Sequence, residues 1–232
     1  MPKKDTVRQM FDGIAPSYDR LNHLMSLGVD RRWRRLAVKE TVDGSAQQIL
    51  DVACGTGDLT IDIAKAAGKG SIVTGMDISK GMMSFVMSKA AHEGVSERIK
   101  LEVADGCNMP WEAGTFHRVT CAFGIRNFED KSKGLEEFLR VLKPGGKLVI
   151  LELSVPSNKF LLALYKLYFL HIMPWIGGMI SGNKAAYKYL PASVMAFPAP
   201  EAFCGMISAA GFRAVRHRAL TFGLCRMYIG EK

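Results

Sequence analysis

Cysteine is scarce and scattered in this sequence. The five cysteines are an odd number, form no C-x-x-C pair, and stand at Cys54, Cys107, Cys121, Cys204 and Cys225. This spacing excludes a disulfide framework, and it lacks the paired ligands of a structural zinc site. We therefore expect reduced cysteines, no metal and a cytoplasmic protein.

Long apolar runs are also few. Residues 1–6 lead into a charged amphipathic segment without the apolar core of a signal peptide. Residues 160–180 are about as long as a membrane span, but Lys166, His171 and Pro174 interrupt the run. Two further strands of the same sheet follow it, which a single crossing would forbid. We expect a helical lid here, and we find no internal repeat or low-complexity tract.

Negative charge is in the minority. Lys and Arg number 31 against 22 Asp and Glu, a formal net charge of +9. A basic surplus indicates an anionic partner: a nucleic acid, an acidic membrane or a phosphorylated ligand. The basic run at residues 31–35 is either a solvated helix face or a peripheral contact with anionic lipid, which Trp33 favours. Nucleic acid is not expected, because no Asp/Asn-Pro-Pro-Tyr motif is present and residues 154–201 are too apolar.

Short β-branched runs alternate with helical stretches, which is typical of a parallel sheet covered on both faces. Seven strands are predicted, at residues 48–53, 71–77, 100–104, 118–123, 147–153, 213–220 and 225–230. The last two are joined by Thr221-Phe-Gly223, too short for a crossover helix, so they form an antiparallel hairpin. The sequence predicts one α/β domain over residues 1–232, with an N-terminal helical cap at 1–40 and a lid at 154–201.

The first strand ends in Asp51-Val-Ala-Cys-Gly55-Thr56-Gly57. Two glycines let the backbone turn tightly toward a ligand at the N-terminus of the following helix. A dinucleotide site is the rival interpretation, but its fingerprint requires a third glycine where this chain has Thr60. Asp51 would repel a pyrophosphate and attract the ammonium of an amino acid, so methionine fits the turn better.

Two more strand ends carry carboxylates. Asp77 ends the second strand, 20 residues after Gly57, and can accept hydrogen bonds from both ribose hydroxyls. Asp105, followed by Gly106, can accept from the adenine amino group. Capping of the helices behind them is the alternative role for both. Because the three strand ends line one crevice, we expect S-adenosylmethionine and a Rossmann-like, seven-stranded methyltransferase sheet with an antiparallel C-terminal hairpin.

Four motifs resemble the C-methyltransferases of menaquinone and ubiquinone biosynthesis, over residues 10–232. They stand at residues 18–28 with Arg32-Trp33, at 123–127, at 140–154, and in the lid at 171–174 with 187–190. Asp30, Ala122 and Ala186 depart from the family pattern. The resemblance implies methyl transfer to a ring carbon of demethylmenaquinol, or alternatively of 2-polyprenyl-6-methoxy-1,4-benzoquinol. An RNA methyltransferase is the more distant alternative.

Such chemistry requires a phenolate, since a ring carbon is a weak nucleophile while the neighbouring hydroxyl, of pKa about 10, keeps its proton. Arg126 is the first candidate to stabilise the oxyanion. We expect it to pair with Asp105 and relay the proton through a water, while Asn127 and Tyr18 orient the ring oxygen.

Further substrate contacts are expected at Asn22, Phe123, His171 and Tyr187. His23, His171 and His217 are alternative bases, of which His171 in the lid is the most plausible and His217 the least. The resemblance leaves a homodimer open.

Overall fold

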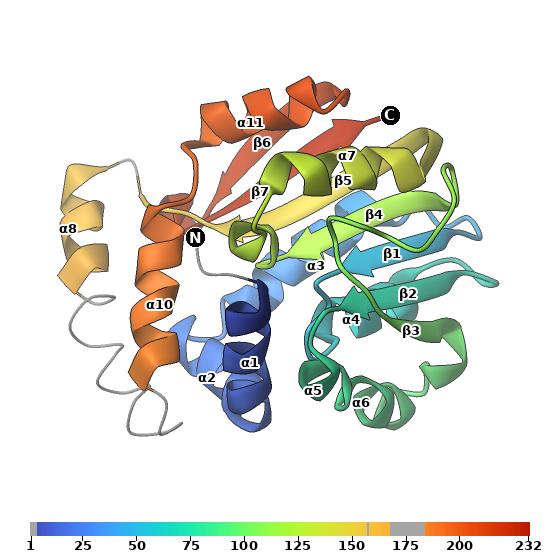
Figure 1. Ribbon diagram of the computed structural model, residues 1–232, viewed down its shortest axis with the longest axis horizontal. Helices are drawn as coiled ribbons and strands as arrows, with labels where there is room; N and C mark the ends of the chain where they lie inside the picture. Colours follow the sequence, from blue (N-terminus) through green and yellow to red (C-terminus); the bar gives the residue numbers. More distant parts are fainter. Residues whose placement is uncertain (1–3, 157, 168–183) are drawn as a thin grey trace.

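The computed structural model describes residues 4–156, 158–167 and 184–232. Its centre is a seven-stranded sheet of order β3-β2-β1-β4-β5-β7-β6 (Figure 1). The strands are β1 (Gln48–Val52), β2 (Ile72–Asp77), β3 (Ile99–Val103), β4 (Phe116–Ala122), β5 (Leu142–Leu153), β6 (Arg213–Leu220) and β7 (Cys225–Glu231). β1 to β5 are parallel, and β7 runs antiparallel to β5 and β6. The predicted methyltransferase-type sheet with its C-terminal hairpin is confirmed.

β5 begins earlier than the sequence suggests. The run at residues 143–146, Lys-Pro-Gly-Gly, reads as a helix stop, and α7 (Lys131–Val141) does end just before it. The strand nevertheless starts at Leu142, opposite Phe116, and its register to β4 shifts before Lys147. A bulge accommodates the proline and glycines that a regular strand would reject.

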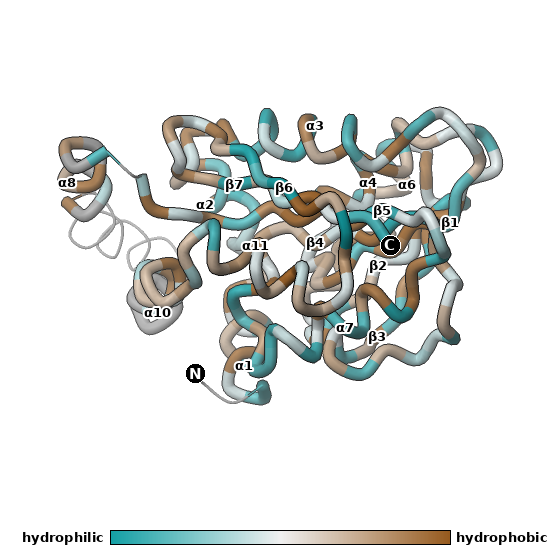
Figure 2. Tube along the Cα trace, turned by 90° about the horizontal axis from the view of Figure 1, so that it is seen from above, coloured by the Kyte–Doolittle hydropathy of each residue, from teal (hydrophilic) through white to brown (hydrophobic). Residues whose placement is uncertain are grey.

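Helices cover both faces of the sheet. One face carries α3 (Asp30–Thr41), α4 (Asp58–Ala66) and α6 (Val86–His92), and the other carries α7 and α11 (Pro200–Ala209) (Figure 2). Neighbouring residues of β1 alternate between the two layers: Ile49 packs in the first core and Leu50 in the second, and neither is exposed. This alternation follows from the two-residue period of a strand.

The remaining helices gather at the carboxyl end of the parallel strands (Figure 1). They are α1 (Lys4–Ile14), α2 (Tyr18–Met25), α5 (Lys80–Met83), and, between β5 and β6, α8 (Lys159–Leu167) and α10 (Lys184–Met195). A small separate core joins α1 and α2, with Ile14 and Leu21 buried against Leu190 of α10. The N-terminal and lid regions thus meet over one edge of the sheet, where ligands bind in such folds.

Among the residues that the structure describes, no single helix has the length and apolar character to cross a membrane. One pair, Tyr189–Met195 with Pro200–Ala209, meets the criterion only as two helices bent by 73°.

Candidate active site

Two neighbouring strand ends adopt a strained backbone. Ala53, after β1, has φ 55°, and Phe123, after β4, has φ 58°. A residue with a Cβ in this left-handed region costs about 1–2 kcal/mol, and such strain concentrates at functional sites. Both residues line the same two cavities, which meet between them.

The first cavity has a volume of about 300 Å³ and lies against the ends of β1, β2 and β3. It gathers several predicted site residues: Tyr18, Gly55, Asp77, Asp105, Gly106, Phe123 and Asn127. Lys4, Val7 and Phe11 of α1 cover its outer side. Carboxylates at successive strand ends suit a cationic, hydroxyl-bearing ligand, so the residues present fit S-adenosylmethionine.

The glycine turn after β1 is hydrogen-bonded to Asp77. Gly55 donates its backbone N–H to Oδ2 of Asp77 at 2.9 Å, and Ser79 donates its own to Oδ1 at 2.8 Å. Burial raises the pKa of Asp77, while these backbone hydrogen bonds oppose the rise. Each carboxylate oxygen keeps a second lone pair for a ligand hydroxyl.

The conformation of this turn requires a glycine at position 57. Its φ is +84°, and a Cβ there would lie 2.7 Å from a methyl carbon of Val86. It is not among the described residues that line either cavity, so its contribution is the turn itself.

Capping is not the role of the two carboxylates. Ser79, rather than Asp77, caps α5 by accepting the N–H of Met82. After Asp105 the next α-helix in the described chain is α7, whose cap is Asp130. The capping alternative is therefore wrong for both Asp77 and Asp105.

Asp51 is buried beneath the glycine turn. Its carboxylate accepts hydrogen bonds from Thr60 at 2.6 Å and from Thr120 at 2.8 Å. Burial raises the pKa of Asp51 from 3.8 to about 6, against the lowering effect of both hydroxyls. The Thr60 hydroxyl thus holds the Asp51 carboxylate in place.

The second cavity is larger and mostly apolar, with a volume of about 470 Å³. The predicted residues that line it are Tyr18, Asn22, Asp51, Gly55, Thr56, Phe123 and Arg126. Leu153, Tyr165 and Leu190 contribute further apolar surface from the end of β5 and from the lid region. This cavity suits a ring with an apolar substituent.

Arg126 does not pair with Asp105, so the expected proton relay between them is wrong. Its guanidinium lies 2.8 Å from Oε1 of Glu152, at the end of β5, while Asp105 pairs with Lys4 at 2.8 Å. The strand order explains the difference: Asp105 follows β3 and Arg126 follows β4, and three strand spacings of about 4.8 Å separate the two.

The ion pair with Glu152 favours the charged form of Arg126. Burial by itself lowers the pKa of Arg126, but attraction to the Glu152 carboxylate, with contributions from Tyr18 and Tyr189, raises it overall. NH1 of Arg126 also donates to the carbonyl oxygen of Phe123. Its Nε is buried and has no hydrogen-bond partner among the described residues.

The Tyr18 phenol interacts electrostatically with this charge. Burial raises the pKa of Tyr18, and the charge of Arg126 and a hydrogen bond with Asn22 partly offset the rise. Tyr18 is therefore a hydrogen-bond donor at neutral pH rather than a base. Asn127 accepts a hydrogen bond of 3.0 Å from Tyr189 of α10, a contact that the sequence did not suggest.

Two predicted substrate residues cannot be placed. His171 lies outside the described residues. Tyr187 lies within α10, and its side chain is likewise outside the described part.

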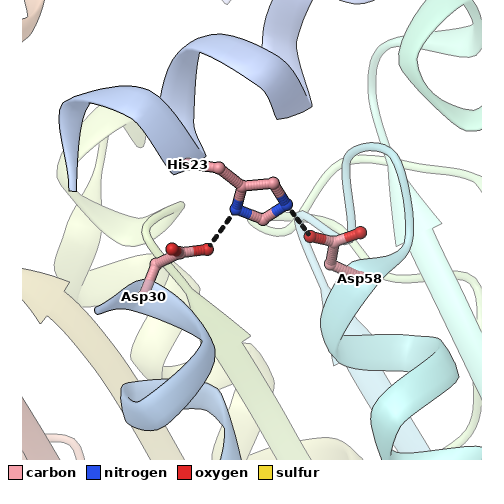
Figure 3. Close-up of side chains that lie close together, drawn as sticks. All are labelled: His23, Asp30 and Asp58. Atoms are coloured by element: carbon pink, nitrogen blue, oxygen red, sulfur yellow. Dashed lines mark hydrogen bonds and ion pairs between the residues drawn. The ribbon is translucent and has the colours of Figure 1, made fainter. Parts of the chain in front are cut away.

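His23 belongs to an ion-pair cluster rather than to a catalytic site (Figure 3). Its ring nitrogens lie 2.8 Å from Asp30 and 3.7 Å from Asp58. These three side chains have metal-like spacing, but Arg34 already contacts Asp30 at 2.6 Å and Asp58 at 3.1 Å. The cluster therefore joins α2, α3 and α4 by charge.

Trp33 is buried, at 5% exposure, and donates to Thr221 at 2.8 Å. The expectation that Trp33 marks a membrane interface is wrong, because its ring points inward from α3 and packs against the turn between β6 and β7. Cys121 is buried and Cys54 is partly buried, and burial raises the pKa of each thiol well above its usual range. Both are therefore poor nucleophiles at neutral pH.

The sequence-based reasoning missed three functional contacts. For Glu152 a signal was present in the sequence, because a carboxylate inside the apolar strand at residues 148–153 requires a partner. Asp12, which accepts from Ser79 at 2.5 Å and from the N–H of Gly81 at 3.1 Å, gave no signal. Asp19, which accepts from Thr56 at 2.5 Å, gave none either, because both contacts join distant parts of the chain.

Solved structures of similar shape share little sequence with this chain. The [4+2]-cyclase SpnF matches with a TM-score of 0.74 and 17% identity, covering 100% of this chain and 97% of that one. A SAM-dependent methyltransferase from Aquifex aeolicus gives a TM-score of 0.59 at 18% identity, covering 85% and 88%. At these identities the likeness shows the fold alone.

Sequence relatives are much closer. The demethylmenaquinone methyltransferase of Deinococcus radiodurans is 47% identical over 99% of this chain and 94% of its own. The ubiquinone/menaquinone biosynthesis C-methyltransferase UbiE of Geobacter sulfurreducens is also 47% identical, over 99% and 90%. The model of the ubiE/COQ5 methyltransferase family matches residues 1–232. The chain therefore belongs to the ubiE/COQ5 methyltransferase family.

Proposed function

We propose that the protein methylates a ring carbon of demethylmenaquinol, with S-adenosylmethionine as the methyl donor. The observation that carries this proposal is the meeting of two cavities at the strained strand ends Ala53 and Phe123. The smaller cavity holds the carboxylates of Asp77 and Asp105, and the larger cavity is mostly apolar and holds the buried Arg126. Relatives named demethylmenaquinone methyltransferase, at 47% identity, support the same substrate.

The cofactor-side residues have distinct tasks. Asp51 would hold the ammonium, Asp77 the ribose hydroxyls, and Asp105 with Gly106 the adenine edge. S-adenosylmethionine, when bound, supplies an electrophilic methyl group on a sulfonium. Lys4 lowers the pKa of Asp105 by hydrogen bond and charge, against the raising effect of partial burial. Asp105 therefore remains an ionised acceptor at neutral pH.

The substrate-side residues favour the phenolate. Arg126 stays charged in a buried place, where a cation stabilises an oxyanion far more than it does in water. Tyr18 donates to the same oxygen, and Asn127, held by Tyr189, orients the ring. The apolar walls exclude water from the transfer. The ring hydroxyl gives its proton to solvent water rather than to Asp105, and Arg126 stabilises the resulting oxyanion by its charge. After methyl transfer the ring carbon loses its hydrogen as a proton to water, which restores the aromatic ring.

The alternative acceptor is a benzoquinol of the ubiquinone branch, since one relative's name covers both pathways. Purified enzyme with short-chain demethylmenaquinol and with the matching benzoquinol separates the two. We expect faster methylation of the naphthoquinol. Arg126→Ala should abolish most turnover while cofactor affinity changes little. Failure to methylate demethylmenaquinol, with folded and cofactor-bound protein, would contradict the proposal, and methylation of RNA instead would favour the distant alternative.

We further propose that the protein works in the cytoplasm and touches anionic membrane only peripherally, because a polyprenyl substrate resides there. Trp33 takes no part. Arg31, Arg32 and Arg35 are exposed, and they form no ion pair with any described residue. Their attraction to lipid headgroups would weaken as salt rises.

A further inference from the structure

Two apolar side chains stand out at the mouth of the larger cavity. Leu27, in the turn between α2 and α3, is 83% exposed, and Phe222, in the turn between β6 and β7, is 80% exposed. Both line the apolar cavity at its outer end. Large exposed side chains beside an apolar opening are typical of an interaction surface.

Both residues are also strained. Leu27 has φ 51°, and Phe222 has φ 57° between Thr221 at 45° and Gly223 at 90°. Glycine or asparagine would occupy these left-handed positions at lower cost. The strained backbone costs the free protein stability, and neither exposed side chain gains burial in return.

The two turns are held side by side. Nε1 of Trp33 donates to Oγ1 of Thr221 at 2.8 Å, which ties the first turn of α3 to the residue before Phe222. Arg32 lies on this same first turn, is exposed, and makes no ion pair within the described chain. Arg31 instead lines a separate cavity on the α4 side of α3, together with Asp62 and Glu93. We call Leu27, Phe222 and Arg32 the cavity rim.

The composition of the cavity rim selects its partner. Apolar side chains next to an exposed cation match an anionic lipid surface, where Leu27 and Phe222 enter the acyl region and Arg32 meets a phosphate. A nucleic acid would use Arg32 but leave Leu27 and Phe222 in water. An apolar protein partner would leave the charge of Arg32 without a counterion.

We propose that the cavity rim docks on an anionic bilayer, so that the apolar cavity opens directly into the membrane. This proposal rests on the proposed function, because only a lipid-borne substrate gives the opening its purpose. The substrate's prenyl tail would then stay in the bilayer while its ring enters the cavity. The methylated ring would then return to the bilayer without exposing the prenyl tail to water.

The test is co-sedimentation with vesicles that contain no quinol, so its outcome is independent of methyl transfer. Wild-type protein should bind vesicles of phosphatidylglycerol and phosphatidylcholine more tightly than phosphatidylcholine alone. Leu27→Asn with Phe222→Asn, which suits both left-handed turns, should weaken binding at least about tenfold. Arg32→Gln should weaken it about fivefold on anionic vesicles only, and rising salt should mimic that change.

Matched controls lie at the other edge of the sheet. Met87→Gln removes an apolar side chain that is 42% exposed on α6, and Lys69→Gln with Lys100→Gln removes two exposed cations. Both controls should bind vesicles as wild type does. Cofactor affinity, measured by calorimetry, should be the same in all variants and shows that each has folded.

Equal vesicle binding by the rim variants and wild type would overturn the proposal, as would wild-type protein that ignores anionic vesicles. A second copy of the chain is the rival occupant. Sedimentation velocity without lipid distinguishes it: a wild-type dimer that becomes monomeric in the Leu27→Asn, Phe222→Asn variant would assign the rim to self-association instead.

Discussion

The guanidinium of Arg126 and the carboxylate of Glu152 form a 2.8 Å ion pair at the floor of the apolar cavity, with side-chain exposures of 5% and 0%. Glu152 also accepts the backbone N–H of Arg126 at 3.1 Å and that of Leu153 at 2.8 Å. One carboxylate thus fixes both the charge of Arg126 and the loop after β4. The pair connects the end of β5 to the proposed oxyanion site.

Glu152→Gln should lower the free energy of unfolding by about 3–5 kcal/mol, because it leaves the buried guanidinium without a counter-charge. Urea denaturation measures the loss. Adding Arg126→Met should restore much of it, since the uncompensated charge is then gone. Additive losses in the double variant would show that the two side chains do not act as a pair.

Arg126→Lys should lower kcat about 100-fold or more, although the charge is conserved. An ammonium cannot contact Glu152 and donate toward the ring oxygen in the geometry of a planar guanidinium. Steady-state kinetics with varied quinol provide the measurement. A variant with wild-type kcat would show that charge without geometry suffices.

Asp51 should make the stability of the cofactor-free protein depend on pH. Its pKa in the folded protein is about 6 against an ordinary 3.8, so between these values the folded state binds more protons than the unfolded state. Stability contributed by Asp51 therefore falls as pH rises from about 4 to about 6. The difference corresponds to about 3 kcal/mol, at about 1.4 kcal/mol per pH unit.

Asp51→Asn removes this titration. Relative to wild type, the variant should gain about 3 kcal/mol of stability between pH 4 and pH 7, measured by urea unfolding at each pH. Saturating S-adenosylmethionine should shrink the gain, because an ammonium near Asp51 favours its ionised form. Parallel pH profiles for the two proteins would rule out the raised pKa.

Tyr189→Phe should reduce kcat/KM for the quinol about fivefold, the effect of losing a hydrogen bond of about 1 kcal/mol to Asn127. Cofactor affinity should change less than that, because Tyr189 does not itself line the cofactor cavity and reaches it only through Asn127. Kinetics with each substrate varied in turn separate the two effects. Weaker cofactor binding would instead indicate that α10 supports the cofactor cavity.

Asp12→Ala should speed dissociation of the cofactor about tenfold. Asp12 joins α1 to α5 through Ser79 and Gly81, and α1 covers the cofactor cavity. Losing these two hydrogen bonds, both of them to a carboxylate oxygen, frees α1 to move away. Stopped-flow displacement of bound cofactor measures the rate, with Asp5→Ala on the exposed side of the same helix as the control.

The cofactor site could be predicted from the sequence because its signals are local. A strand, a glycine turn and a carboxylate at the next strand end are neighbours in the chain, and the alternating pattern placed those strand ends on one edge of the sheet. The family motifs added the substrate class. Asp51, Asp77 and Asp105 lie along that edge as expected, and the antiparallel hairpin follows from a connection too short for a helix.

Tertiary structure alone decided which side chains meet across that edge. Arg126 pairs with Glu152 and not with Asp105, because the strand order places β5 beside β4 and β3 three positions away. Trp33 is buried, while Leu27 and Phe222 emerge together at the cavity mouth. Local sequence patterns indicate which strand or helix a residue belongs to. Its partners depend on how distant elements pack, and those partners determine its charge state, its pKa and its exposure.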